Sequence, residues 1–309
     1  MFKLTVNNIE QLARINSFLI PDDQMVFFGL RGCLPLSDDS TEFKEEHDVT
    51  VASYDHIHPK CTLGQYYPSK GIALFPGSTV PHIKYIRNSI ENGGLGANML
   101  LTGYYKEYRK GIHNDGSSTA HQAFRQDGYL PVRRTSNDLT YDNNDPADFT
   151  RPYDNLHAAW SMGPDHDCFS SAGCQVVVGY PKCANRNNSP DTGPWKIFKN
   201  NAYIIDQENF SYMLLTGIEA QKVAGSQGHN LSVRLRFGSK GDLVSIVQEK
   251  LQKLNYYTGD IDDDFGFHTL RALLRFQENY FGKDADDGIV GPMTASALKI
   301  KWPDEELVR

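Results

Sequence analysis

The sequence lacks a long apolar run. No stretch approaches the roughly 18 consecutive apolar residues that a membrane-spanning helix needs. Asn7, Glu10 and Arg14 interrupt the continuous apolar core that a Sec signal peptide requires near its start. We therefore expect a protein that has no membrane span and is synthesised in the cytoplasm without a signal peptide. Any action at the periplasm or cell wall would then require delivery by a route other than Sec.

The sequence also lacks an excess of positive charge. Its 31 Lys and Arg residues are outnumbered by 38 Asp and Glu residues, which gives a formal net charge of −7. Proteins that bind nucleic acid carry a basic surface that neutralises phosphates, so nucleic acid is not an expected partner. The hydrophobic content of 39% is typical of a soluble globular protein. A chain of 309 residues has room for about two domains.

Cysteine pairs with metal-binding spacing are absent. The five cysteines contain no CxxC pair, so we expect no structural zinc, no other metal and no cofactor. Their number is odd, which fits one free thiol. The remaining four either are all reduced or pair in one of three ways, and Cys168 and Cys183 flank the loop of Cys174. The cysteines are Cys33, Cys61, Cys168, Cys174 and Cys183.

The pattern of apolar residues changes near residue 220. Before it, short apolar runs alternate with Gly, Pro, Asn and Asp, which predicts strands joined by turns, with one helix at 81–92 and a long polar loop at 136–155. After it, Val244, Val247 and Leu251 recur at helical spacing. We predict a mixed, multi-domain protein with a β-rich domain at 1–220, a linker at 221–236 and a small three-helix domain at 237–302. The predicted strands are 25–30, 49–54, 71–77, 98–105, 174–181 and 210–217.

Residues 238–300 carry a specific set of motifs. They include Gln248, the Tyr256-Tyr257 pair, the Phe276-Gln277 pair and the run from Asp287 to Pro292. In this order and spacing the segment resembles the peptidoglycan-binding domain of bacterial wall hydrolases. The resemblance implies peptidoglycan as a partner. Most of these residues have the character of core and turn positions, so they do not identify individual wall contacts.

A cysteine stands where a small polar run meets a β-type apolar run. Ser170, Ser171, Ala172 and Gly173 precede Cys174, and QVVVG follows it. A core cysteine has no need of such small neighbours, whereas a nucleophile must admit a substrate carbonyl. The backbone N–H groups of Gly173 and Cys174 are then candidate oxyanion donors. His157 precedes Cys174 by 17 residues, and a neighbouring imidazole activates a thiol and lowers its pKa.

The residues around this pair strengthen that interpretation. Together they resemble the catalytic segment of L,D-transpeptidases (YkuD-type), which begins with His and ends in a Ser-X-Gly-Cys turn. The resemblance implies Cys174 as nucleophile, His157 as base and the Ala158 carbonyl as the group that orients the imidazole. Two positions depart from it: Ala172 replaces a usual His, and Val176 replaces a usual Arg or Asn. The residues that carry the resemblance are His157, Trp160, Ser161, Gly163, Ser171, Gly173 and Cys174.

Further side chains are candidates for binding the substrate. Trp160 and Ser171 lie within the catalytic segment. Arg133 or Arg134 could hold a carboxylate, but only one of them, because neighbouring side chains on a strand point to opposite faces. His113 is interpreted as a solvated loop histidine and is the next candidate base after His157.

These observations predict a cysteine enzyme that acts on peptidoglycan stem peptides through an acyl-enzyme. The reaction would be that of an L,D-carboxypeptidase, an endopeptidase or a transpeptidase. The missing leader favours an antibacterial effector, delivered by an apparatus such as type VI secretion and countered by an immunity protein. Two alternatives stay open: a phage endolysin, and a non-catalytic wall-binding protein with a degenerate enzyme domain.

Overall fold

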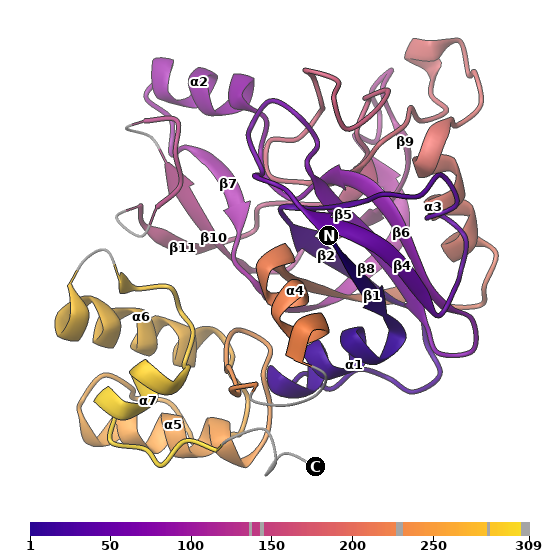
Figure 1. Cartoon of the computed structure of the whole chain (residues 1–309). Coiled ribbons are helices and arrows are strands. Elements are labelled where there is room, and N and C mark those ends of the chain that lie inside the picture. Colours follow the sequence, from indigo (N-terminus) through magenta and orange to yellow (C-terminus); the bar gives the residue numbers. More distant parts are fainter. Residues whose placement is uncertain (136–137, 143–144, 227–230, 283–284, 304–309) are drawn as a thin grey trace.

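Eight strands close into a barrel in the computed structural model, which describes residues 1–135, 138–142, 145–226, 231–282 and 285–303 (Figure 1). Closure leaves the barrel without free strand edges. Most neighbours are antiparallel, but β12 and β13 are parallel, as are β2 and β14. In barrel order the strands are β12 Leu156–Ala158, β13 Gln175–Val177, β6 Gly71–Ser78, β5 Cys61–Tyr67, β2 Val26–Arg31, β14 Asn209–Thr216, β8 Gly103–His113 and β9 His121–Arg125.

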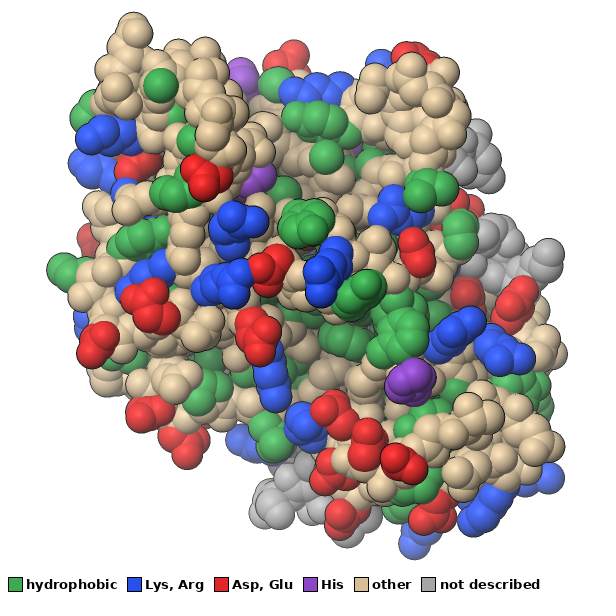
Figure 2. All heavy atoms as spheres, turned by 180° about the vertical axis from the view of Figure 1, so that it is seen from behind, with side chains coloured by type: hydrophobic (Ala, Val, Ile, Leu, Met, Phe, Trp, Pro, Cys, Tyr) green, Lys and Arg blue, Asp and Glu red, His purple; other side chains and the backbone are tan. Residues whose placement is uncertain are grey.

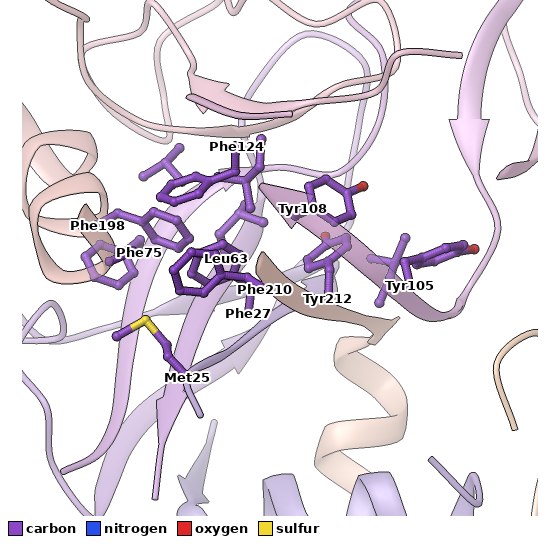
Figure 3. Packing of buried hydrophobic residues seen from close by; sticks show 14 of the residues in the cluster. Met25, Phe27, Leu63, Phe75, Tyr105, Tyr108, Phe124, Phe198, Phe210 and Tyr212 are labelled. Atoms are coloured by element: carbon purple, nitrogen blue, oxygen red, sulfur yellow. The ribbon is translucent and has the colours of Figure 1, made fainter. Parts of the chain in front are cut away.

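Aromatic side chains fill the barrel and attach one helix to it (Figure 3). Phe27 on β2 stacks on Phe210 of β14 with ring centroids 4.5 Å apart, and meets Phe124 of β9 edge-on at 4.8 Å. Helix α3, Gly193–Tyr203, adds Trp195 and Phe198, both fully buried. A short 3₁₀ turn, η1 Ala184–Arg186, precedes α3. This core provides a rigid wall for the loops at the barrel ends.

A second apolar layer covers the outside of the barrel. Helices α1, Val6–Ile15, and α4, Gly217–Ser226, pack with the sheet of β1 Phe2–Thr5, β4 Glu46–Val51 and β3 Cys33–Pro35. The stretch 221–236 was predicted as a linker, and the structure corrects this. Ala220 and Val223 of α4 are buried in this layer, while Val233 and Leu235 are buried in the C-terminal domain.

A small third sheet lies between the barrel and the C-terminal helices (Figure 1). It consists of β7 Ala97–Leu100, β10 Leu130–Thr135 and β11 Ala147–Thr150, and helix α2, Ile83–Glu91, precedes β7. The single strand predicted at 98–105 is therefore two strands, β7 and β8, in different sheets. The loop predicted at 136–155 contains β11, and its residues 136–137 and 143–144 lie outside the described residues.

The C-terminal domain has the three predicted helices, α5 Asp242–Lys253, α6 Phe267–Phe281 and α7 Pro292–Ala297. Two buried glutamines organise its turns. Gln248 donates to Asp262 over 2.6 Å and to Thr269 over 2.9 Å, and Gln277 donates to Asp287 over 2.7 Å. A buried amide needs such partners, since an unpaired one costs free energy. A β-rich N-terminal region with a helical C-terminal domain is confirmed, while an L,D-transpeptidase-type fold for the former stays a prediction.

The two parts of the chain are joined by charged and aromatic contacts. The fully buried Arg236 pairs with Glu219 of α4 and donates to Thr102 over 2.9 Å. Phe149 of β11 meets Phe267 of α6 edge-on with centroids 3.9 Å apart. Seen from behind the view of Figure 1, hydrophobic side chains gather among charged ones (Figure 2). None of the helices in the described residues is both long and apolar enough to cross a bilayer.

Candidate active site

Two parallel strands bring His157 and Cys174 together. His157 lies in the middle of β12, opposite Val176 of β13, and Cys174 immediately precedes β13. A third residue joins them from another strand. His113 ends β8, which pairs with β9, and β9 in turn pairs with β12. One ligand atom from each of His113, His157 and Cys174 lies within 4.8 Å of the others.

The imidazole of His157 is held in one tautomer. Its Nδ1 lies 2.8 Å from the carbonyl oxygen of Ala158. A carbonyl only accepts hydrogen bonds, so Nδ1 carries the proton and Nε2 carries a free electron pair. Burial, together with the positive charges that His113 and His121 would carry, holds the pKa of His157 well below its ordinary value. His157 is therefore neutral at physiological pH, which is the state required of a base.

The resting state of Cys174 differs from the sequence-based prediction. Burial, followed by the Asp154 carboxylate, raises the pKa of the Cys174 thiol, although the backbone N–H groups of Asn155 and Cys174 act in the opposite direction. The expected lowering of this pKa by the histidine is therefore wrong for the free protein. Because His157 is neutral, it supplies no positive charge to stabilise a thiolate. Sγ instead donates weakly to the Tyr153 carbonyl over 3.8 Å.

The turn before Cys174 is built around Gly173. Its φ is +143°, and a Cβ there would lie 2.5 Å from Asp154 Oδ1. Its N–H donates to Ser171 Oγ over 3.1 Å, and Ser171 in turn donates to the Cys174 carbonyl over 2.7 Å. The Gly173 N–H is therefore engaged in the resting turn, and the Cys174 N–H stays a predicted oxyanion donor. Ser171 is buried, so it holds the turn in place and does not face a substrate.

A buried carboxyl group lies beneath this turn. Asp154 is 2% exposed, and its Oδ2 has no hydrogen-bond partner among the described residues. Burial raises the pKa of Asp154 to about 7, against a weaker effect of the Asn98 amide. The sequence alone does not identify Asp154 as a site residue, because acidic residues are common in polar loops. Its proximity to Gly173 is created by the tertiary structure.

His113 is not the solvated loop histidine predicted from sequence. It is half-buried, and its ring stacks on that of His157 with centroids 4.0 Å apart. Asn155 Nδ2 lies 2.9 Å from His113 Nδ1, and Asn155 Oδ1 accepts the backbone N–H of Gln126 over 3.0 Å. A third histidine, His121, lies edge-on to both imidazoles at 5.3 and 5.5 Å. His113 is the last residue of strand β8, Gly103–His113, and does not belong to a loop.

The other predicted binding residues are scattered. Trp160 is half-buried beside the cluster, with its ring 6.1 Å from that of His121. Arg133 is buried, and it donates to the Asp286 carbonyl of the C-terminal domain over 2.7 Å. Arg134 Nε lies 3.5 Å from Asp148 Oδ2. The assignment of Arg133 to substrate is therefore corrected: its guanidinium joins the two domains.

His113, His157 and Cys174 form the only group of His, Cys, Asp and Glu in the described ranges that is close enough to hold a metal ion. A zinc ion accepts imidazole nitrogen and thiolate ligands, each of which must offer an electron pair. His157 offers one at Nε2. His113 accepts the Asn155 amide at Nδ1, so its Nε2 carries a proton and offers none. All five cysteines are free thiols, so Cys168 and Cys183, which flank the loop of Cys174, do not form a disulfide across it.

An aromatic cleft separates the barrel from the C-terminal domain. It has a volume of about 610 Å³ and is lined by Gln126 and by aromatic residues that include Tyr129, Phe149 and Phe267. Gln126 is also the residue whose N–H fixes Asn155 beside His113. The cleft therefore shares one residue with the network that surrounds the cluster.

Comparison with known proteins places the C-terminal domain. Residues 240–298 match the model of a putative peptidoglycan binding domain. The chain is 45% identical over 58 residues to the N-acetylmuramoyl-L-alanine amidase CwlM of Mycobacterium tuberculosis, covering 19% of this chain and 14% of the relative. It is 33% identical over 92 residues to the spore cortex-lytic enzyme of Bacillus subtilis, covering 30% of this chain and 28% of that relative.

The chain thus spans less than a third of either relative. Neither match is long enough to cover the barrel together with the C-terminal domain, so these enzymes say nothing specific about Cys174. No solved structure matches the chain. What the comparisons establish is a chain homologous in part to enzymes of the cell wall, with a peptidoglycan-binding domain at its C-terminal end.

Proposed function

We propose that this protein is a cysteine enzyme that acts on peptidoglycan stem peptides through an acyl-enzyme. The observation that carries the proposal is the arrangement of Cys174, His157 and the Ala158 carbonyl. The thiol lies beside the base, and the base is oriented by the carbonyl group. Nucleophilic catalysis requires this arrangement. The C-terminal domain supports peptidoglycan as the substrate polymer.

The reaction begins when His157 Nε2 takes the proton from Cys174 as sulfur attacks a substrate carbonyl carbon. The new C–S bond forms and the C=O electrons move to oxygen. When they return, the C–N bond breaks and His157 gives its proton to the leaving amine, which leaves a thioester. Attack by water gives hydrolysis, whereas attack by another amine gives transfer; both restore the thiol and the neutral imidazole.

The electrostatics of the resting site favour proton transfer at the moment of attack. The pKa of Cys174 is raised and that of His157 is lowered, so the neutral pair is more stable than the thiolate–imidazolium pair. A free protein of this kind keeps its thiol protonated and poorly reactive until a substrate arrives. The substrate carbonyl accepts the negative charge as it develops, so charge separation is confined to the reaction itself.

The binding domain raises the concentration of the active site along the polymer. It is packed against the barrel through the Arg236–Glu219 pair and the Phe149–Phe267 contact. Tethering of this kind helps on intact sacculi and gives no advantage on small soluble muropeptides. Hydrolases that lack a tether depend on diffusion for each encounter.

The test is incubation of the full chain with purified muropeptides, followed by mass spectrometry of the products. We expect loss of a terminal residue, cleavage of a cross-link or exchange of an amine, each at a stem peptide. Cys174→Ala and His157→Ala should abolish the change, and Cys168→Ala, at a half-exposed thiol outside the cluster, should leave it intact. A change that survives Cys174→Ala would reject the mechanism, and an inert wild type that still binds sacculi would favour the non-catalytic alternative.

We further propose that the enzyme acts in the periplasm as an antibacterial effector. The support is its wall-binding domain together with the proposed chemistry at stem peptides. Fusion to a Sec leader in a Gram-negative host should cause lysis that depends on Cys174, whereas cytoplasmic expression should not. Rescue by a neighbouring gene product would identify an immunity protein, and a neighbouring holin gene would favour the endolysin alternative.

A further inference from the structure

His113 is fixed as a hydrogen-bond donor by a chain of three residues. The backbone N–H of Gln126 can only donate, so the oxygen of the Asn155 amide must face it, at 3.0 Å. The Asn155 NH₂ group then faces His113 Nδ1, at 2.9 Å. An amide NH₂ donates, so Nδ1 must accept, and a neutral imidazole that accepts at Nδ1 carries its proton at Nε2.

The two stacked imidazoles are therefore held in opposite tautomers. His157 is protonated at Nδ1 and presents an electron pair at Nε2, whereas His113 presents an N–H at Nε2. Each has one ring nitrogen engaged within the protein. One ring nitrogen of each histidine and Cys174 Sγ lie within 4.8 Å of one another, so the imidazole of His113 stands beside both the thiol and the base.

We propose that His113 donates its Nε2–H to the oxyanion that forms when Cys174 attacks the substrate carbonyl. The inference rests on the proposed function and assigns one residue more to it. The two histidines then divide the work: His157 moves the proton and His113 stabilises the negative charge on oxygen.

Two further observations support this role. Of the two backbone N–H groups predicted as oxyanion donors, that of Gly173 is engaged by Ser171. His113 is also the most exposed of the three clustered residues, whereas His157 is 2% exposed and Cys174 is 9% exposed. His113 is therefore the cluster residue most open to an arriving substrate, and the described residues offer no hydrogen-bond partner to its Nε2.

His113 stays neutral while it acts. Burial, followed by the charges that His121 and Arg125 bring, lowers the pKa of His113 to about 4. Near neutral pH it is therefore an uncharged donor that does not compete with His157 for the proton of the thiol. Donors fixed in advance at the position of a developing charge need no reorganisation during the reaction, and loss of one costs about 10²–10³-fold in kcat.

A direct test is ¹⁵N NMR of the imidazoles in the full-length protein, with the His113 signals assigned from their disappearance in His113→Gln. We expect a neutral imidazole protonated at Nε2 near neutral pH, and a switch of tautomer or loss of order in Asn155→Leu. A resting imidazole protonated at Nδ1 would overturn the inference. This readout does not depend on turnover, so it can fail while Cys174 is still shown to be the nucleophile.

Two variants give the kinetic test on soluble muropeptides. His113→Phe keeps an aromatic ring against His157 but has no N–H, and we expect kcat to fall by about 10²–10³-fold with little change in KM. His113→Gln places an amide NH₂ near the former Nε2 and should retain activity within about tenfold of wild type, since the amide still donates to an oxyanion. An equal loss of kcat in the two variants, with both folded by circular dichroism, would overturn the donor role. Glutamine keeps a hydrogen-bond donor and phenylalanine does not, so a donor role predicts different losses.

Discussion

His157 donates its Nδ1–H to the carbonyl oxygen of Ala158, the residue that follows it, over 2.8 Å. The bond joins adjacent residues of one short strand, so it survives any motion that leaves β12 intact. It leaves the electron pair of Nε2 free without the use of a third side chain. Ala158 thus acts through its backbone, and its side chain is free to pack inside the barrel, where it is fully buried.

Alkylation of the free protein should show a slow Cys174. Burial and Asp154 raise the pKa of this thiol, so little thiolate is present near neutral pH. We expect iodoacetamide to label the half-exposed Cys168 faster than Cys174, as measured by peptide mass spectrometry over time. Faster labelling of Cys174 than of Cys168 would show a preformed ion pair with His157 and contradict the neutral resting state.

Replacement of the buried carboxyl group should shift the titration of Cys174. Asp154→Asn removes the charge that raises the thiol pKa while it keeps the shape of the side chain. The midpoint of the pH dependence of alkylation at Cys174 should therefore move to lower pH. Asp148→Asn, at an exposed carboxyl group on β11, is the control and should leave that midpoint unchanged.

The same variant should change how stability depends on pH. The folded-state pKa of Asp154 is raised from 3.8 to about 7, so the native state holds this proton more tightly than the unfolded state. Its contribution to stability is therefore present below pH 3.8 and is lost as the pH rises toward 7, by about 1.4 kcal/mol for each unit of the shift. In urea unfolding, the free energy of unfolding of Asp154→Asn should rise relative to that of wild type as the pH increases over that interval. A difference between the two that does not change with pH would contradict the raised pKa.

A side chain at position 173 should be poorly tolerated. Gly173→Ala places a Cβ at φ +143° and 2.5 Å from Asp154 Oδ1. Backbone strain of this kind costs on the order of 1–3 kcal/mol, and the turn that carries Cys174 must shift to relieve the clash. Gly163→Ala is the matched control, since no atom lies within 4 Å of its Cβ. Thermal unfolding and muropeptide turnover should both fall for the first variant and hardly change for the second.

Arg133 should matter for the domain contact and not for the substrate. Arg133→Met removes donors to the Asp145 and Asp286 carbonyls, and hydrogen bonds to charged groups contribute about 1.5–3 kcal/mol each. We expect lower stability in urea, with kcat and KM on soluble muropeptides unchanged in the folded protein. A specific rise in KM with unchanged stability would restore the sequence-based assignment of Arg133 to substrate.

The sequence predicted those features that local patterns encode. Helical spacing at Val244, Val247 and Leu251 predicted α5, and the motifs around Gln248 and Gln277 predicted the C-terminal domain that the family comparison confirms. The proximity of His157 and Cys174 could also be predicted from the sequence, because both lie within one short segment whose strands pair.

The sequence could not predict what the barrel brings together from afar. His113 reaches His157 only because β8, β9 and β12 are neighbours in a closed barrel, and strand order is not written in local spacing. Asp154 and the thiol pKa follow from burial beneath a turn. The linker prediction was wrong for a related reason: small and polar residues at 221–236 looked unstructured, but the apolar positions among them pack on two different cores.

The central claim is that Cys174 forms a thioester with a stem peptide. The most direct measurement is intact-protein mass spectrometry after rapid acid quenching of a reaction with an excess of muropeptide, followed by peptide mapping. The account predicts a mass increase equal to the acyl part of the substrate, located on the peptide that contains Cys174 and absent in Cys174→Ala. Turnover without any adduct on that peptide, or an adduct that persists in Cys174→Ala, would contradict it.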